Sequence, residues 1–170
     1  MKGLLSLDVD GNDYWVVKAM NAVQPRLIIA ECNNLVPTDK SLTIKYDPSY
    51  TRVHNSDYVG ASVLAMQGLF RDRGYRMIGA NRHGCNVLFL RNTLGEKLFP
   101  EVPIAQIHDN HWTRLGRRTR LPKIKICPGG SLANPRASAG ARYRISAPRA
   151  PRFFRRAIFC YRNCDAGRLA

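Results

Sequence analysis

The fold is decided by the stretch Leu4-Leu5-Ser6-Leu7-Asp8-Val9-Asp10-Gly11-Asn12-Asp13-Tyr14-Trp15. An apolar run of strand length is followed by a cluster of acids and a glycine, and then by a helical pattern of apolar residues. This order is typical of α/β proteins, in which parallel strands present polar side chains at the carboxyl edge of the sheet. We therefore expect a functional site to begin at the end of this strand.

A strand–helix–strand unit is predicted from residue 4 to residue 32. Apolar residues recur at helical spacing after Asn12 and Asp13, which predicts a helix of about 11 residues with one of these two side chains as its cap. The sequence Gln24-Pro25 ends that helix, and residues 26–32 form a second apolar run that contains Glu31.

The right-handed connection of such a unit makes its two strands parallel. Because the carboxyl ends of parallel strands meet at one edge of the sheet, Asp8, Asp10 and Glu31 are expected to lie together there.

The remaining elements close the predicted sheet. Residues 33–57 lack a sustained period and carry Pro37 and Pro48, so we expect a long loop of the kind that is often a functional lid, with a short strand over 42–46. Ser56 or Asp57 is expected to cap a helix with Val59 on its inner face, ending near residue 73. Residues 75–80 and 85–91 then predict an antiparallel hairpin.

The composition is that of one α/β domain in a reducing compartment. The chain has 170 residues, 45% of them apolar, which is enough for a hydrophobic core. No apolar run approaches the roughly 20 residues that a membrane span needs, and no signal-peptide pattern opens the chain. Five cysteines at irregular spacing suit reduced thiols. We expect a cytoplasmic protein with no membrane contact and no metal site.

Positive charge is concentrated toward the carboxyl terminus. Residues 1–110 hold 12 Lys and Arg against 11 Asp and Glu, whereas residues 111–170 hold 15 against one, Asp165. The apolar pattern also decays after about Pro103. The sequence therefore predicts two parts: an α/β domain over 1–105, and a basic, Arg- and Pro-rich tail over 106–170 that is largely disordered.

The residues of the acidic cluster allow a comparison with three known kinds of site. A calcium loop that starts at Asp8 would need glycine at its sixth position, where Asp13 stands. A D-x-D glycosyltransferase would need a nucleotide-binding segment before the motif. A haloacid-dehalogenase-like phosphohydrolase opens with D-x-D-G-T, but Asn12 replaces the threonine, and no later pair of acids follows a strand to hold Mg²⁺.

A fourth reading rests on resemblance. The succession of residues 4–15, 25–31, 46–48, 56–62, 74–79 and 86–90 resembles the carboxy-terminal half of FkbM-like S-adenosylmethionine-dependent methyltransferases. The resemblance implies a partial Rossmann-like class I methyltransferase sheet. Residues 4–10 would be its fourth strand, residues 26–32 its fifth, and the antiparallel hairpin its last two strands.

The resemblance also implies roles for four side chains. Asp8 and Asp10 would face the reactive end of the cofactor, S-adenosylmethionine, whereas Asn12 and Glu31 would be catalytic residues at the border of the acceptor site. The methyl acceptor is unknown. In the family, the glycine-rich cofactor turn and a second-strand acid precede the acidic strand, which here begins at residue 4. We therefore expect a truncated methyltransferase that is inactive alone and shows no measurable binding of the cofactor in a calorimetric titration, where micromolar affinity would overturn the expectation.

Two further expectations concern partners. The first strand would lack a partner on one side, which favours self-association through that sheet edge. Arginines and aromatic residues in the tail could bind nucleic acid non-specifically, which is the non-enzymatic alternative. A frame-disrupted gene would produce the same Arg, Pro, Ala and Gly bias, and we favour that origin for the tail.

Overall fold

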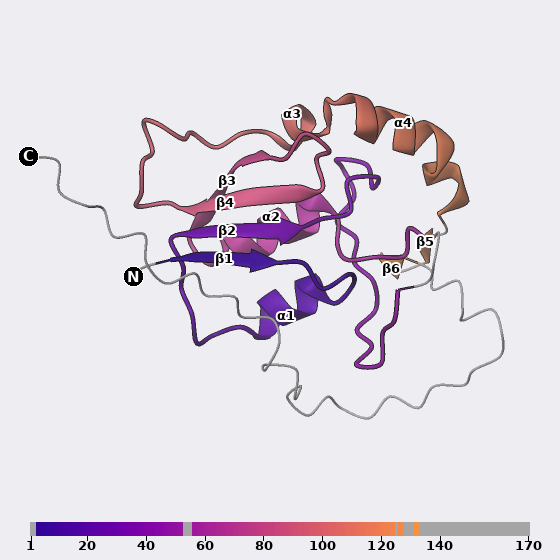
Figure 1. The fold of residues 1–170 in the computed structure, drawn as a ribbon, viewed down its shortest axis with the longest axis horizontal. Helices are drawn as coiled ribbons and strands as arrows, with labels where there is room; N and C mark the ends of the chain where they lie inside the picture. The colour runs from indigo at the N-terminus through magenta and orange to yellow at the C-terminus, as the bar shows by residue number, and fades with distance from the viewer. Residues whose placement is uncertain (1–2, 53–55, 125, 128–130, 133–170) are drawn as a thin grey trace, which may run out of the picture.

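The computed structural model describes residues 3–52, 56–124, 126–127 and 131–132. A four-stranded mixed sheet forms the centre of the fold (Figure 1). Across the sheet, its strands are ordered β1 (Leu4–Leu7), β2 (Leu27–Glu31), β4 (Asn86–Arg91) and β3 (Tyr75–Ala80). The predicted α/β class is thus confirmed, in a form compatible with a partial Rossmann-like arrangement.

The first two strands form the predicted parallel pair. Leu4 pairs with Leu27 and Leu7 pairs with Ala30, and α1 (Asp13–Ala19) connects the strands. The hairpin of β3 and β4 is antiparallel, as predicted, and its second strand, β4, inserts between β2 and β3. β3 is therefore parallel to β2. Within the described residues, β1 has a strand partner along one edge only.

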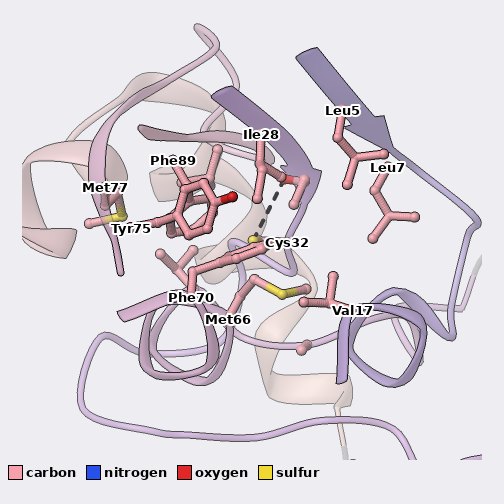
Figure 2. Close-up of a cluster of buried hydrophobic side chains, with 14 of the residues drawn as sticks. Leu5, Leu7, Val17, Ile28, Cys32, Met66, Phe70, Tyr75, Met77 and Phe89 are labelled. Carbon is pink, nitrogen blue, oxygen red and sulfur yellow. Dashed lines mark hydrogen bonds between the residues drawn. The ribbon is translucent and has the colours of Figure 1, made fainter. Parts of the chain in front are cut away.

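The main core lies between this sheet and the helices α1 and α2 (Val63–Arg71) (Figure 2). Phe70 of α2 and Phe89 of β4 are both fully buried, and their ring centres are 4.4 Å apart. Val17 of α1 and Met66 of α2 bury the helices against the same cluster. Apolar residues at helical spacing give α1 and α2 one apolar side each. This side packs on the buried face of the sheet, where every second strand residue points inward.

Both helices differ in extent from the sequence expectation. α1 has 7 residues, because the chain turns to an extended conformation at Met20. The expected start of α2 at Ser56 or Asp57 is wrong, since its N-cap is Ser62, whose hydroxyl accepts a hydrogen bond from Ala65 N at 3.1 Å. Gly60, two residues before this N-cap, has a non-helical φ of +53°, so Val59 lies outside α2.

The long segment after β2 packs as an ordered loop with its own small core. Val36, Leu42, Ile44, Tyr58 and Leu132 are its buried members. The short strand expected over 42–46 is reduced to one bridge between Thr43 and Ala61. Trp15 of α1 donates its indole N–H to Ile44 O at 2.9 Å, which joins this loop to the main domain.

The described fold continues past the boundary expected at residue 105. α3 (Ile104–His108), α4 (His111–Thr119) and the 3₁₀ turn η1 (Leu121–Lys123) occupy a stretch that we expected to belong to the disordered tail. That expectation is corrected for residues 106–124. The strands β5 (Ile126–Cys127) and β6 (Ser131–Leu132) pair antiparallel beyond it. Residues 133–170, the rest of the expected tail, lie outside the described residues.

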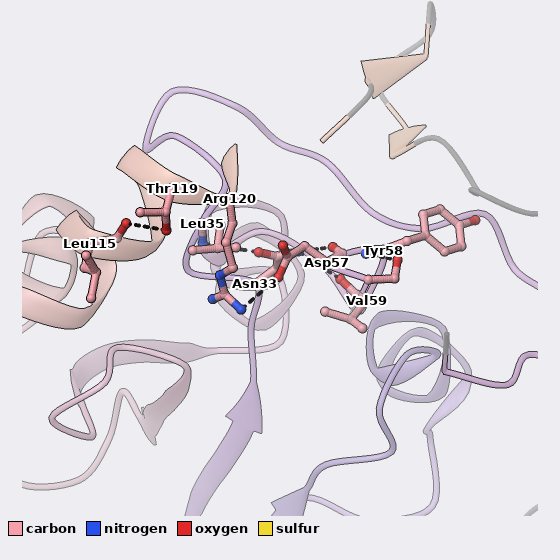
Figure 3. Close-up of polar contacts among 9 residues, drawn as sticks. Asn33, Leu35, Asp57, Tyr58, Val59, Leu115, Thr119 and Arg120 are labelled. Carbon is pink, nitrogen blue, oxygen red and sulfur yellow. Dashed lines mark hydrogen bonds and ion pairs between the residues drawn. The ribbon is translucent and has the colours of Figure 1, made fainter. Parts of the chain in front are cut away.

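Polar contacts explain why a basic, weakly apolar stretch packs on the domain. Arg117 of α4 donates to the carbonyl oxygens of Leu35 at 3.2 Å and Val36 at 2.6 Å. Arg120 pairs with Asp57 at 3.1 Å, in the loop that Asn33 also ties down (Figure 3). Arginine side chains here satisfy backbone groups, an interaction that a search for apolar periodicity does not detect.

The turn between β3 and β4 lies in close contact with the α3–α4 segment. Gly84 has φ of +71°, and a Cβ placed there would lie 3.0 Å from Ile107 O. Glycine therefore permits both the turn and the close approach of α3. Among the described residues, none of the helices has the length and apolarity required to cross a membrane. The cytoplasmic location and the self-association of the β1 edge stay predictions.

Candidate functional site

The loop after β1 turns sharply, and the ring of Tyr50 packs against it. Asp10 adopts a left-handed conformation with φ of +58°, which side chains other than glycine rarely do. At Gly11, a Cβ would lie 2.1 Å from Cε1 of the Tyr50 ring, so only glycine fits. The Asp-Gly pair of the motif is thus explained by the backbone path and by the ring that covers it.

Asp13 holds this loop from inside. Its side chain is fully buried, and its two carboxylate oxygens accept hydrogen bonds from Val9 N and Gly11 N, each at 3.0 Å. Burial raises the pKa of Asp13, whereas these backbone donors oppose the rise. Asn12, not Asp13, occupies the N-cap of α1, and its side chain makes no capping hydrogen bond. The expectation that one of these two side chains caps the helix is therefore corrected.

Three carboxylates meet at the carboxyl edge of the parallel pair. Asp8 and Asp10 are exposed, Glu31 is partly buried, and one oxygen of each lies within 4.8 Å of the others. The sequence expectation that these residues share one edge is confirmed. Carboxylate oxygens this close to each other could hold a divalent cation, because Mg²⁺ and Ca²⁺ prefer oxygen ligands. Arg52 supplies positive charge to the cluster through an ion pair with Asp10.

Glu31 is the group in the cluster that can exchange a proton near neutral pH. Burial, followed by the negative charge of Asp8 and then of Asp13, raises its pKa to about 7. Its Oε2 is buried without a hydrogen-bond partner among the described residues. A carboxyl group in this condition can accept a proton from a neighbouring molecule and later release it.

Asn12, the fourth predicted site residue, lies in the loop after β1. Its amide nitrogen donates to Asp47 O at 2.8 Å, which fixes the side chain, while its Oδ1 is buried and has no partner within the described part of the chain. The structure thus places all four predicted site residues on β2 or the loop after β1. Asp8, Asp10 and Glu31 form the carboxylate cluster, and Asn12 lies two residues after Asp10 in the chain.

The segment 47–52 contributes residues that sequence analysis did not single out. Tyr50 packs over Gly11 and donates its hydroxyl hydrogen bond to Tyr58 O at 2.6 Å, and burial raises the pKa of this phenol to about 12. Arg52 forms the ion pair with Asp10. The length of the loop was the available signal, since long loops in compact domains are often functional.

Cys32 follows Glu31 but is a structural residue. Its thiol is fully buried, with Sγ donating to Ala30 O at 3.7 Å (Figure 2), and burial raises its pKa well above the ordinary value. A thiol in this state is a poor nucleophile and a poor metal ligand.

Comparison with known proteins gives no relative: no protein-family model, no curated protein and no solved structure matches the chain. The FkbM-like resemblance is therefore a proposal that rests on the residues of this chain.

The raised pKa of Glu31 predicts a pH-dependent stability. Folding raises this pKa from 4.5 to about 7, so the native state binds more protons than the unfolded state between these values. The free energy of unfolding should therefore fall as pH rises from about 4.5 to about 7 and then level off. The full shift corresponds to about 3 kcal/mol, which partial exposure reduces to about 1–2 kcal/mol.

The variant Glu31→Gln should remove the decrease in the free energy of unfolding that comes from Glu31. Urea unfolding of both proteins at pH 5, 6, 7 and 8 measures it, and Glu96→Gln, at an exposed glutamate, is the matched control. A wild-type profile that Glu31→Gln leaves unchanged would show that Glu31 titrates at an ordinary value.

Proposed function

We propose that the chain is the carboxy-terminal part of an FkbM-like methyltransferase domain, in which the edge formed by Asp8, Asp10, Asn12 and Glu31 serves methyl transfer from S-adenosylmethionine. The observation that carries the proposal is the meeting of Asp8, Asp10 and Glu31 within 4.8 Å, with the pKa of Glu31 raised to about 7. A parallel strand–helix–strand unit followed by an antiparallel hairpin is also the partial sheet that the resemblance implies.

The residues present fit the implied cofactor in charge and in hydrogen-bonding capacity. S-adenosylmethionine carries a positive sulfonium group, which the exposed negative charges of Asp8 and Asp10 would attract. Asn12 Oδ1 and Glu31 Oε2 are acceptors without partners among the described residues, so a bound molecule that donates hydrogen bonds would satisfy them. Such a molecule is either the cofactor or the acceptor.

Each residue then has a defined task. When bound, S-adenosylmethionine supplies a methyl group whose bond to sulfur breaks, with its electron pair going to sulfur, as the bond to the acceptor forms. Asp8 and Asp10 attract and orient the positive group. Glu31, about half ionised at neutral pH, takes the proton that the acceptor atom loses. Asn12, held by Asp47 O, accepts a hydrogen bond that orients the acceptor.

A charge comparison tests this proposal. S-adenosylhomocysteine lacks the methyl group and the positive charge, so the two molecules differ at the proposed contact alone. Two unit charges about 4 Å apart are worth about 1 kcal/mol in water, which predicts about fivefold preference for S-adenosylmethionine. Both affinities can be measured by NMR chemical-shift titration up to millimolar concentration, where binding too weak for calorimetry is still detected.

The double variant Asp8→Asn/Asp10→Asn should reduce this preference to about one. Asp39→Asn, which removes an exposed carboxylate that pairs with its neighbour Lys40 at 3.3 Å, is the matched control and should keep the preference. Equal affinity of the wild-type chain for the two molecules, or the absence of any shift from either, would refute the proposed contact.

A further inference from the structure

An exposed aromatic and basic surface lies at the β3–β4 turn and the start of α4, and its residues are not used by the proposed reaction. It consists of Arg82 and His83 in the β3–β4 turn together with His111 and Trp112 in the first turn of α4, and we call it the aromatic–basic patch. All four residues are exposed, and Trp112 leaves 45% of its surface open to solvent. Figure 1 shows α4 along the outer side of the domain, beside α3.

The indole ring of Trp112 is held by edge-on contacts. The His83 ring centre lies 5.2 Å away at 74°, and the His111 ring centre lies 5.4 Å away at 81°. The guanidinium of Arg82 lies 5.9 Å from the centre of the Trp112 ring. Perpendicular rings and one cation fix the orientation of the indole while nearly half of its surface stays free.

The frame under the patch is rigid. Thr113, the residue after Trp112, is fully buried, and Asn34 donates to both Thr113 Oγ1 at 3.1 Å and His83 O at 2.6 Å. The same side chain thus ties the turn and the helix together. A ring held in this way can stack on a ligand with little further loss of conformational entropy.

Charge points to an anionic partner. From residue 111 to residue 124, the chain carries five Arg and Lys side chains and no acid. Arg118 of α4 is exposed and lies on the same face of the helix as His111, seven residues earlier, where it adds to the positive charge of Arg82. Arg114 is ion-paired with Asp109 at 3.4 Å. A partner that combines planar rings with regularly spaced negative charges matches a fixed indole flanked by arginines.

We propose that the aromatic–basic patch binds single-stranded nucleic acid, with one base stacked on Trp112 and neighbouring phosphates held by Arg82 and Arg118. The proposal is independent of methyl transfer and of residues 133–170. Duplex nucleic acid keeps its bases stacked on each other, so it would meet only the cations.

Fluorescence anisotropy of a labelled ten-nucleotide thymidine oligomer, titrated with the full chain, tests the proposal. Stacking of one base on an aromatic side chain contributes about 1–3 kcal/mol, so Trp112→Ala should weaken binding about 5- to 100-fold. Trp112→Phe should retain most of the affinity. Phe99→Ala, at another aromatic residue that is 50% exposed, is the matched control and should bind like the wild type.

Salt dependence separates stacking from charge. Arg82→Gln should lower the slope of log affinity against log salt by about 0.7, whereas Trp112→Ala should leave that slope unchanged. Arg26→Gln, at an exposed arginine just before β2, is the charge control and should keep the wild-type slope.

A chain with Trp15→Phe keeps Trp112 as its one tryptophan, and its fluorescence should be quenched when the oligomer binds. The proposal fails if Trp112→Ala binds the oligomer as tightly as Phe99→Ala does, or if the Trp112 fluorescence is unchanged at saturation. It also fails if duplex binding loses as much affinity as single-strand binding in Trp112→Ala.

Discussion

Asp13→Ala should destabilise the domain by about 2–3 kcal/mol and release the loop that carries Asp8 and Asp10. The fully buried Asp13 carboxylate accepts hydrogen bonds from Val9 N and Gly11 N, and alanine would leave both donors without this partner. An unsatisfied buried donor costs about 1–3 kcal/mol. Removal of a desolvated carboxyl group offsets part of that loss, as the raised pKa of Asp13 indicates.

The variant Asp13→Asn tests the same hydrogen bonds with a smaller change of side chain. Asparagine has one acceptor oxygen where Asp13 uses two, and its amide group would face a backbone N–H, so the loss should be smaller than for alanine but still measurable. Urea unfolding measures both variants, with Asp39→Ala as the exposed control. Hydrogen exchange at the amides of Val9 and Gly11 should accelerate in both. Variants as stable as the control would show that Asp13 does not support the loop.

Phe89→Ala should have the largest effect on stability, about 3–5 kcal/mol. Phe89 is fully buried at the centre of β4, where it pairs with Ile28 of β2 and Met77 of β3, and its ring packs 4.4 Å from that of Phe70. Truncation removes buried area and leaves a cavity between the sheet and α2. Because domains are typically stable by about 5–15 kcal/mol, this variant should be close to unfolding at 37 °C.

The matched control for Phe89→Ala is Phe99→Ala, because Phe99 is 50% exposed and its loss should change stability by less than about 0.5 kcal/mol. Thermal and urea unfolding of the two variants beside the wild type give the comparison. Similar values for the two variants would mean that β4 does not occupy the middle of the sheet.

Sequence patterns were sufficient for the parts of the fold that rest on local periodicity. The alternating run of β1, the helical spacing of α1 and the apolar run of β2 predict a parallel unit, and with it the meeting of Asp8, Asp10 and Glu31. The hairpin of β3 and β4 was predicted for the same reason. Its strand order was not, because insertion of β4 beside β2 depends on tertiary packing.

Long-range polar contacts account for most of what the sequence did not predict. Ser62, not Ser56, begins α2, because an extended segment that pairs with Thr43 and Asn33 precedes it. α4 packs through Arg117 on backbone carbonyls of the loop after β2. Such bonds join residues about 80 positions apart, and neither composition nor period reveals them.

The same limit applies within the candidate site. Asp13 resembles an ordinary helix cap in the sequence, yet in the structure it accepts two backbone hydrogen bonds from the preceding turn. Tyr50, in a loop much later in the chain, covers Gly11. The steric demand at Gly11 is visible only when both segments are in place.

In the proposed reaction, the methyl-bearing end of S-adenosylmethionine binds at the edge formed by Asp8, Asp10, Asn12 and Glu31, and the acceptor receives the methyl group. The most direct measurement is an NMR experiment on the full chain with S-adenosylmethionine labelled with ¹³C at its methyl group, in which nuclear Overhauser contacts from that methyl are assigned. The proposal predicts contacts to the side chains of Asp8 and Asp10, which orient the sulfonium group, and to those of Asn12 and Glu31. Contacts to residues elsewhere in the chain, or none at a concentration that saturates the chemical-shift changes, would contradict it.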